Sequence, residues 1–247
     1  MLHVSSLLID TAMPAKSASS ATHKHRTQRM SGNSVGSEIV AAPMESVHIV
    51  VLGAPGVGKT SLIEQHVTCR FPEIPKPTTV ASVYTTAAVL DSQLFEINIV
   101  DMPTIPFYPL EDSIRRPSED EMNGYASAIS AAEALIFVYD INSPDTFEYI
   151  RELREHILDC YEDDAEVPFM VVGNKQDLDS KRHPRRHYSQ VVRKSWKCGY
   201  LECSAKFNWR VVTLFSEVMR MITGTNSKDS HSSGKIRLLK NKKCSIM

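Results

Sequence analysis

A phosphate-binding loop between a strand and a helix is the feature that most constrains the fold of this chain. Residues 53–60 read GAPGVGKT and match the pattern G-x-x-x-x-G-K-[ST] in full. The apolar run 47–52 (VHIVVL) before it predicts a buried strand, and residues 60–68 after it suit a helix. The motif requires this context, because the helix points its positive end at a bound anion. A glycine-rich turn without a ligand is the alternative, and the two flanking elements disfavour it.

The residue types in the loop each have a chemical reason. Glycines supply unusual backbone dihedrals and let backbone N–H groups wrap closely around a polyphosphate. Lys59 brings a positive charge to the β- and γ-phosphates, and the Thr60 hydroxyl can bind Mg²⁺. We therefore predict a continuous phosphate-binding segment made of Gly53, Ala54, Pro55, Gly56, Val57, Gly58, Lys59, Thr60 and Ser61.

The other apolar runs predict an α/β fold with a mostly parallel sheet. Residues 78–90 and 94–100 form a hairpin by pattern, and further strands are predicted at 134–141, 167–173 and 201–203. One helix begins at the sequence Ser-Pro-Asp of residues 143–145, and the last helix spans about 208–222, with Gly224 as its stop. The segment 102–126 contains four prolines and is too long for an ordinary connection, which is typical of functional loops.

Two loops at the carboxyl ends of predicted strands have the chemistry to select a base. The Asp177 carboxylate can accept hydrogen bonds from the N1–H and the 2-amino group of guanine, and adenine offers neither donor. Residues 174–177 (NKQD) follow one buried strand, and residues 204–206 (SAK) follow the next and can present a backbone N–H to guanine O6. The predicted guanine contacts from these loops are Asn174, Lys175, Asp177, Ser204, Ala205 and Lys206.

In this order and spacing, GxxxxGKT, NKxD and ECSAK resemble the motifs of the Ras-like small GTPases. The resemblance covers residues 47–224 and implies a P-loop G domain that binds GTP or GDP with Mg²⁺. It implies a six-stranded, mostly parallel sheet with one antiparallel edge strand and helices on both faces. Phe71 would pack against guanine, and Lys175 would lay its aliphatic stem along the base.

The resemblance also implies roles around the metal and the γ-phosphate. Thr78 lies 18 residues after Thr60 and matches the switch I threonine, which binds Mg²⁺ and senses the γ-phosphate. Thr79 leaves the register open by one residue, and Pro77 favours Thr78. Asp101 would act on the metal through water, which makes Thr60, Thr78 and Asp101 the implied metal residues and Lys59 and Thr78 the implied catalytic ones.

Three departures from the family pattern concern hydrolysis. Thr104 replaces the glycine of D-x-x-G, and Ile105 stands where a glutamine normally orients the attacking water. Pro55 removes a backbone donor beside the γ-phosphate. We expect nucleotide binding to survive and hydrolysis to be slow, or to depend on a group within 102–126. Together with the block WKCGYLECSAKFNW, these departures resemble the Ras-like family member 10 branch.

The ends of the chain differ in composition from its middle. Residues 11–46 are rich in Ser, Ala and Thr, and residues 1–46 are predicted to be a disordered extension more than a transit peptide. The overall charge of −1 hides residues 225–247, where six basic residues stand against one acid. This flexible polybasic tail ends in CSIM, which fits C-a-a-X with farnesylation of Cys244. A solvated basic tail with an incidental cysteine is the alternative, and the other scattered cysteines indicate reduced thiols.

These features predict a Ras-type guanine-nucleotide switch that cycles between GTP and GDP states in signal transduction. A GTP-bound adaptor with little hydrolysis is the alternative, and a P-loop kinase or ATPase is opposed by the NKQD loop. We expect a cytoplasmic monomer held on anionic lipids at the inner face of the plasma membrane, with a nuclear pool left open by the basic run. Effector and regulator proteins would bind the switch loops, and no nucleic-acid partner is expected.

Overall fold

A computed structural model describes residues 44–106, 118–160, 166–178, 185–224 and 235–237. The main path of its sheet has the spatial order β2-β3-β1-β4-β5-β6, and along this path of described strands the β2–β3 pair alone is antiparallel. The six strands are β1 (Glu45–Gly53), β2 (Ser82–Leu90), β3 (Gln93–Asp101), β4 (Ala134–Asp140), β5 (Glu166–Asn174) and β6 (Gly199–Glu202). The predicted mostly parallel sheet with an antiparallel edge strand is therefore confirmed.

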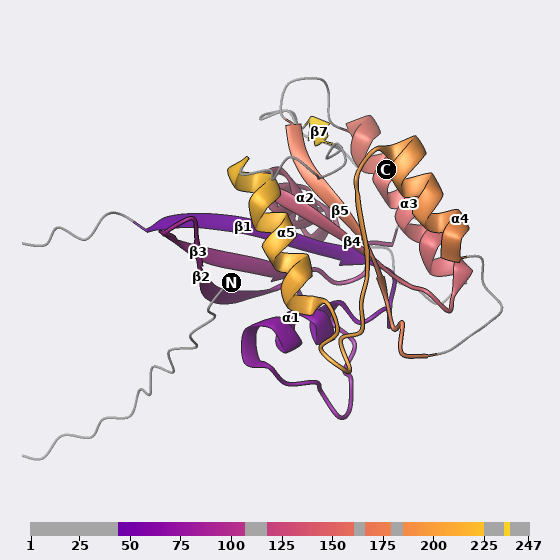
Figure 1. Cartoon of the computed structure of the whole chain (residues 1–247). Coiled ribbons are helices and arrows are strands. Elements are labelled where there is room, and N and C mark those ends of the chain that lie inside the picture. Colours follow the sequence, from indigo (N-terminus) through magenta and orange to yellow (C-terminus); the bar gives the residue numbers. More distant parts are fainter. Residues whose placement is uncertain (1–43, 107–117, 161–165, 179–184, 225–234, 238–247) are drawn as a thin grey trace, which may run out of the picture.

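Helices cover both faces of this sheet (Figure 1). They are α1 (Lys59–Thr68), α2 (Glu119–Ser130), α3 (Pro144–Cys160), α4 (Arg185–Gln190), the π-helical turn η1 (Val191–Trp196) and α5 (Val211–Thr223). Helices α1 and α5 lie side by side in front of the sheet in this view, with α2 behind it. Within the described ranges, none of the helices combines the length and apolar composition needed to cross a bilayer.

The burial pattern of the strands explains the layers. Six of the seven residues of β4 are buried, as expected for a central strand covered on both faces, whereas β2 at the edge alternates between exposed and half-buried residues. The hairpin turns at Asp91 and Ser92, which both have positive φ. Because β1, β4 and β5 are parallel, their carboxyl ends at Gly53, Asp140 and Asn174 meet at one edge of the sheet.

Two element boundaries differ from the prediction for local reasons. Strand β2 begins at Ser82, four residues later than predicted, because the Thr78 hydroxyl turns away to bind Thr60. Helix α5 begins at Val211 because Arg210 has positive φ, and Trp209 forms an antiparallel bridge with Ser204. At its other end, α5 stops at Gly224 as predicted, where φ is +69°.

Four elements appear where regular structure was not predicted, namely α2, α4, η1 and a short strand in the predicted tail. Helix α2 occupies the second half of the 102–126 segment, where half-buried Met122 and Tyr125 and buried Ile129 give a helical stripe. The weak helix formers Asn123 and Gly124 obscure that stripe in the sequence. A short strand, β7 (Lys235–Arg237), falls within the predicted flexible tail and pairs antiparallel with residues 166–168 of β5. Of the predicted N-terminal extension, residues 1–43 lie outside the described residues, whereas Glu45 and Ser46 belong to β1, so the predicted boundary at residue 46 is two residues too late. Residues 107–117 and Cys244 also lie outside the described residues.

Candidate nucleotide-binding site

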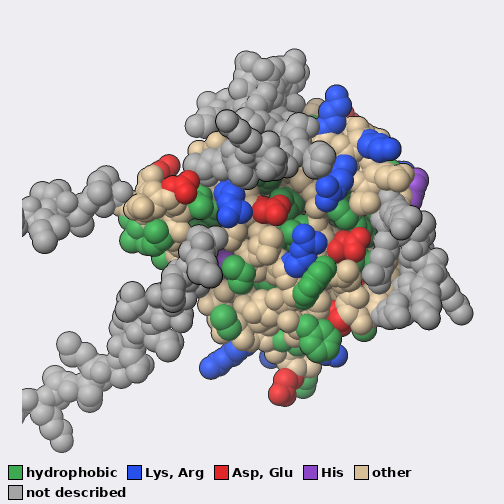
Figure 2. Space-filling view, viewed as in Figure 1, with side chains coloured by type: hydrophobic (Ala, Val, Ile, Leu, Met, Phe, Trp, Pro, Cys, Tyr) green, Lys and Arg blue, Asp and Glu red, His purple; other side chains and the backbone are tan. Residues whose placement is uncertain are grey.

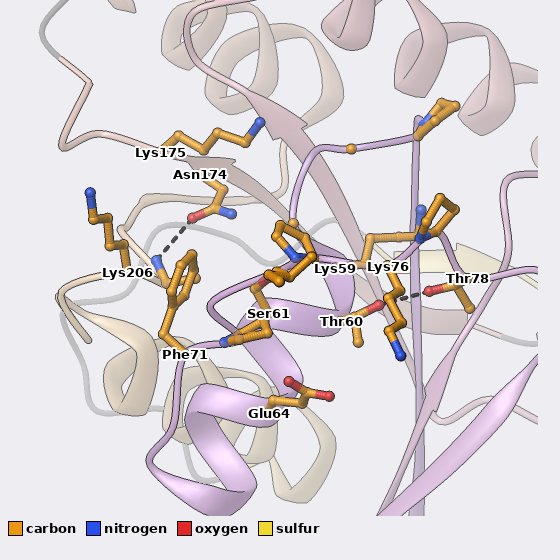
Figure 3. A pocket seen from close by; sticks show the side chains of 18 of the residues that line it. Lys59, Thr60, Ser61, Glu64, Phe71, Lys76, Thr78, Asn174, Lys175 and Lys206 are labelled. Atoms are coloured by element: carbon orange, nitrogen blue, oxygen red, sulfur yellow. Dashed lines mark hydrogen bonds between the residues drawn. The ribbon is translucent and has the colours of Figure 1, made fainter.

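A cavity of about 600 Å³ lies where the carboxyl ends of the strands meet. Most of the predicted site residues line it, namely Pro55, Gly56, Gly58, Lys59, Thr60, Ser61, Phe71, Thr78, Asn174, Lys175, Asp177, Ala205 and Lys206. Figure 3 shows Thr60 and Thr78 together at one end, and Asn174 with Phe71 toward the other. The other predicted residues that contact this lining form hydrogen bonds to Lys59, Thr60, Asn174 or Asp177; they are Gly53, Ala54, Val57, Asp101 and Ser204.

Lys59 is the charged centre of the phosphate end. Its ammonium is buried and donates hydrogen bonds to the carbonyl oxygens of Gly53 (2.8 Å) and Ala54 (3.1 Å). Burial lowers the pKa of Lys59 from 10.5 to about 8, and the nearby Asp101 carboxylate opposes this shift. The negative charge of a bound polyphosphate would stabilise the charged form of this buried ammonium. Helix α1 starts at this residue without a side-chain cap, so its first N–H groups are left for an anion.

Three oxygen atoms converge beside the phosphate end. The Thr60 hydroxyl donates to Asp101 Oδ2 at 2.6 Å, the Thr78 hydroxyl donates to the same oxygen at 3.0 Å, and the two hydroxyls lie 2.8 Å apart. Asp101 Oδ1 is buried and has no hydrogen-bond partner within the described part of the chain. Hydroxyl and carboxylate oxygens are the ligands that Mg²⁺ prefers, and Mg²⁺ keeps waters that an orphaned carboxylate oxygen can bind. The residues present therefore fit the implied ion, with Thr78 in the predicted register.

Asn174 joins the base loops to the phosphate loop. Its side-chain amide donates to the Val57 carbonyl at 2.9 Å, and its Oδ1 accepts a hydrogen bond from the Ala205 N–H at 3.1 Å. Gly58 packs against this amide with φ of +94°, and a Cβ there would lie closer than 3.0 Å to Asn174 Nδ2. The contact requires glycine both for its dihedral and for its lack of a side chain.

The remaining base residues are held by partners that the sequence did not reveal. Ser204 Oγ donates to Asp177 Oδ1 at 2.6 Å, which orients the carboxylate predicted to bind guanine. The Lys175 ammonium lies 2.9 Å from Asp140 Oδ2, and this ion pair fixes the lysine stem. Asp140 was missed because nothing in its sequence neighbourhood marks it. The one available signal is that it ends a buried strand, which the structure places in register with Asn174.

Thr104 and Ile105, the two departures in the segment that begins after Asp101 and that we call switch II, lie in different surroundings. Thr104 lines the cavity, as expected for the position after Asp101-Met-Pro. Ile105 is only 1% exposed and belongs to the hydrophobic core. Its backbone N–H donates to the Tyr149 hydroxyl at 3.1 Å, and the same hydroxyl donates to the Ile105 carbonyl at 2.7 Å. No motif in the sequence marks Tyr149, which lies on α3.

A phosphate-loop motif, a cluster of hydroxyl and carboxylate oxygens and the NKQD loop at one cavity are the features of P-loop proteins that bind guanine nucleotides. The sequence model of the Ras family matches residues 48–104 and 122–224. The chain belongs to the Ras family. Members of this family are GTPases that bind GTP and GDP, typically with Mg²⁺.

Individual relatives agree with this assignment. The chain is 36% identical to human Ras-like protein family member 10B over 83% of its own length and 100% of the relative. It is 40% identical to mouse Ras-like protein family member 10A over 71% of its length and 85% of the relative. It is 31% identical to the Ras-related protein Ral-a of Drosophila melanogaster over 74% of its length and 83% of the relative. These similarities confirm the predicted member 10 branch.

Proposed function

We propose that this chain is a membrane-associated guanine-nucleotide switch with slow intrinsic GTP hydrolysis. The burial of Ile105 is the observation that carries the proposal of slow hydrolysis. An apolar side chain in the core can neither orient the attacking water nor swing into the cavity to do so. Among the described residues that line the cavity, none is a glutamine or a histidine. Binding is retained, because the contacts of Lys59 and Asn174 do not depend on position 105.

The cycle between the two states would work through Thr78 and Mg²⁺. Thr78 already faces Thr60 and Asp101, so a γ-phosphate would complete a site that the protein has largely arranged. An adaptor that stays bound to GTP is the second candidate, and the same burial of Ile105 favours it. The two candidates differ only in whether hydrolysis occurs within the lifetime of the bound nucleotide.

Single-turnover cleavage of γ-labelled GTP by the purified full-length chain with Mg²⁺ tests both candidates. A glutamine-bearing Ras-family protein measured in parallel is the reference. We expect cleavage at least tenfold slower than the reference, and an equal rate would refute the proposal. Cleavage slower than nucleotide release would select the adaptor. Competition between GTP and ATP in the same preparation tests the base preference.

For the membrane, we propose farnesylation of Cys244 together with the basic tail. One lipid chain binds a bilayer only reversibly, and each basic residue adds about 1 kcal/mol near an anionic leaflet. On the face shown in Figure 2, Lys and Arg side chains are interspersed with Asp and Glu, and they form no uniformly basic patch there. We therefore propose that the basic residues of the tail supply the attraction to anionic lipids. The chain would then be a monomer on the inner face of the plasma membrane, with effectors and regulators at the switch loops. Mass spectrometry of protein from a eukaryotic host, with Cys244→Ser as the control, should find the farnesyl mass only on the wild type.

A further inference from the structure

The start of switch II is attached to the protein at two points. At one end, the Met102 N–H donates to the Val51 carbonyl of β1 at 3.3 Å, and the Met102 side chain is fully buried. At the other end, both backbone groups of Ile105 bind the single hydroxyl of Tyr149. Between these attachments lie only Pro103, which is buried, and Thr104, which is half-buried beside the cavity. The segment is therefore a short bridge between β1 and α3.

The Tyr149 contact is well suited to be permanent. The hydroxyl satisfies one donor and one acceptor of the same residue, as an adjacent strand would, and it does so inside the core. Tyr149 is only 7% exposed, and burial raises the pKa of its phenol above the ordinary value of 10. The hydroxyl thus keeps its proton, and its hydrogen bond to Ile105, at every physiological pH. Movement of Ile105 would leave these polar groups unpaired and bring an apolar side chain into water.

We propose that Tyr149 is a positioning residue that holds residues 102–105 in one conformation in both the GDP and the GTP state. A conformational switch needs a segment with two arrangements of similar free energy, and the buried bridge removes the second arrangement. The nucleotide state would then be reported by switch I through Thr78, and the start of switch II would not respond. This inference rests on the proposed function, because it assumes that both nucleotides bind.

Hydrogen exchange of the full-length protein, loaded with Mg²⁺ and either GDP or GTPγS, tests this proposal. We expect the Ile105 amide to exchange at the same rate in the two states within twofold, while amides near Thr78 exchange at least fivefold more slowly with GTPγS. A change of fivefold or more at Ile105 would overturn the proposal. This comparison uses only the wild-type chain, so it does not depend on any variant that fails to fold.

The variant Tyr149→Phe keeps the ring and removes the hydroxyl. We expect Ile105 exchange to accelerate at least tenfold and to become dependent on the nucleotide, which a purely structural loss would not cause. Tyr200→Phe is the matched control, because it removes the hydroxyl of a half-buried tyrosine on β6, whose partners are Tyr139 and Glu202 and not residues 102–105. Equal exchange at Ile105 in Tyr149→Phe and the wild type would refute the role of the hydroxyl.

The outcome is separable from that of the proposed function. Rapid GTP cleavage with unchanged Ile105 exchange would reject slow hydrolysis and leave the bridge in place. Slow GTP cleavage together with Ile105 exchange that depends on the nucleotide would support slow hydrolysis and reject the fixed bridge. The amount of guanine nucleotide released from the denatured protein shows whether the shared assumption of binding holds.

Discussion

The contact between Asn174 and Gly58 gives a quantitative prediction about how the two halves of the site are coupled. Replacing Asn174 with alanine removes the bonds to Val57 and Ala205 and leaves a buried carbonyl and a buried N–H unpaired. Each such loss costs about 1–3 kcal/mol, and part of it is expressed as weaker nucleotide binding. We therefore expect Asn174→Ala to speed GDP release by about 30- to 100-fold, equivalent to about 2–3 kcal/mol.

Gly58→Ala perturbs the same contact from the other side. The new Cβ strains a backbone at φ +94° and also collides with the Asn174 amide. In the double variant the collision is absent and only the strain remains. The two effects on the rate of GDP release should therefore fall short of additivity by at least about 1 kcal/mol, well above the usual error of a double-mutant cycle.

Release of a fluorescent GDP analogue, measured for the four proteins of the cycle, is the assay. Gly56→Ala supplies a control cycle, because Gly56 also has positive φ (+70°) but a Cβ there meets no protein atom within 4 Å. Its effect should add to that of Asn174→Ala. Additive behaviour of Gly58→Ala with Asn174→Ala, within about 0.5 kcal/mol, would refute the proposed coupling.

Three further predictions concern stability, base selection and packing. The His66 ring stacks on Phe215 at 4.0 Å between centroids, and burial lowers its pKa from 6.5 to about 4. Between about pH 6.5 and pH 4 the His66 ring is protonated in the unfolded chain and neutral in the folded chain. The free energy of unfolding should therefore fall by about 2 kcal/mol from pH 7 to pH 5. Urea unfolding should show this slope, and His66→Phe should remove it; an unchanged slope would contradict the assignment. Asp177→Asn replaces an acceptor with a donor, so GTP affinity should fall by about 100-fold. Affinity for xanthosine triphosphate, whose C2 carbonyl can accept that donor, should rise, as calorimetry with both nucleotides can test. Phe71→Ala should speed GDP release by less than tenfold, because the ring is already 37% exposed, and a larger effect would mean that it closes over the base.

The parts of the site that the sequence predicts are those whose chemistry is local. The phosphate loop and the NKQD loop combine particular residue types at fixed spacing, and the structure brings Lys59, Asn174 and Asp177 to one cavity as predicted. The succession of strands along the chain and the mostly parallel sheet also followed from the pattern of apolar runs. Such features need no knowledge of what lies across the fold.

The missed residues depend on contacts between distant segments. Asp140 holds Lys175 only because β4 and β5 are in register, and Tyr149 binds Ile105 across 44 positions of the chain. The sequence shows that Ile105 replaces the usual glutamine, but it does not show whether this isolated apolar side chain faces solvent or the core. Helix α2 was missed because Asn123 and Gly124 weaken its local signal, while packing of Ile129 against the core stabilises it.

Strand β7 has a geometric consequence for a protein tethered to a bilayer. It pairs with residues 166–168, at the end of β5 opposite Asn174, and so lies at the end of the sheet away from the nucleotide cavity (Figure 1). Seven peptide units join Arg237 to Cys244, so these two residues can lie at most about 25 Å apart. With β7 paired to β5 and the proposed lipid on Cys244, the end of the sheet away from the nucleotide cavity would be the end that stays within that distance of the bilayer. Separation of β7 from β5 would leave Gly224 as the last anchored residue before Cys244 and would remove that limit.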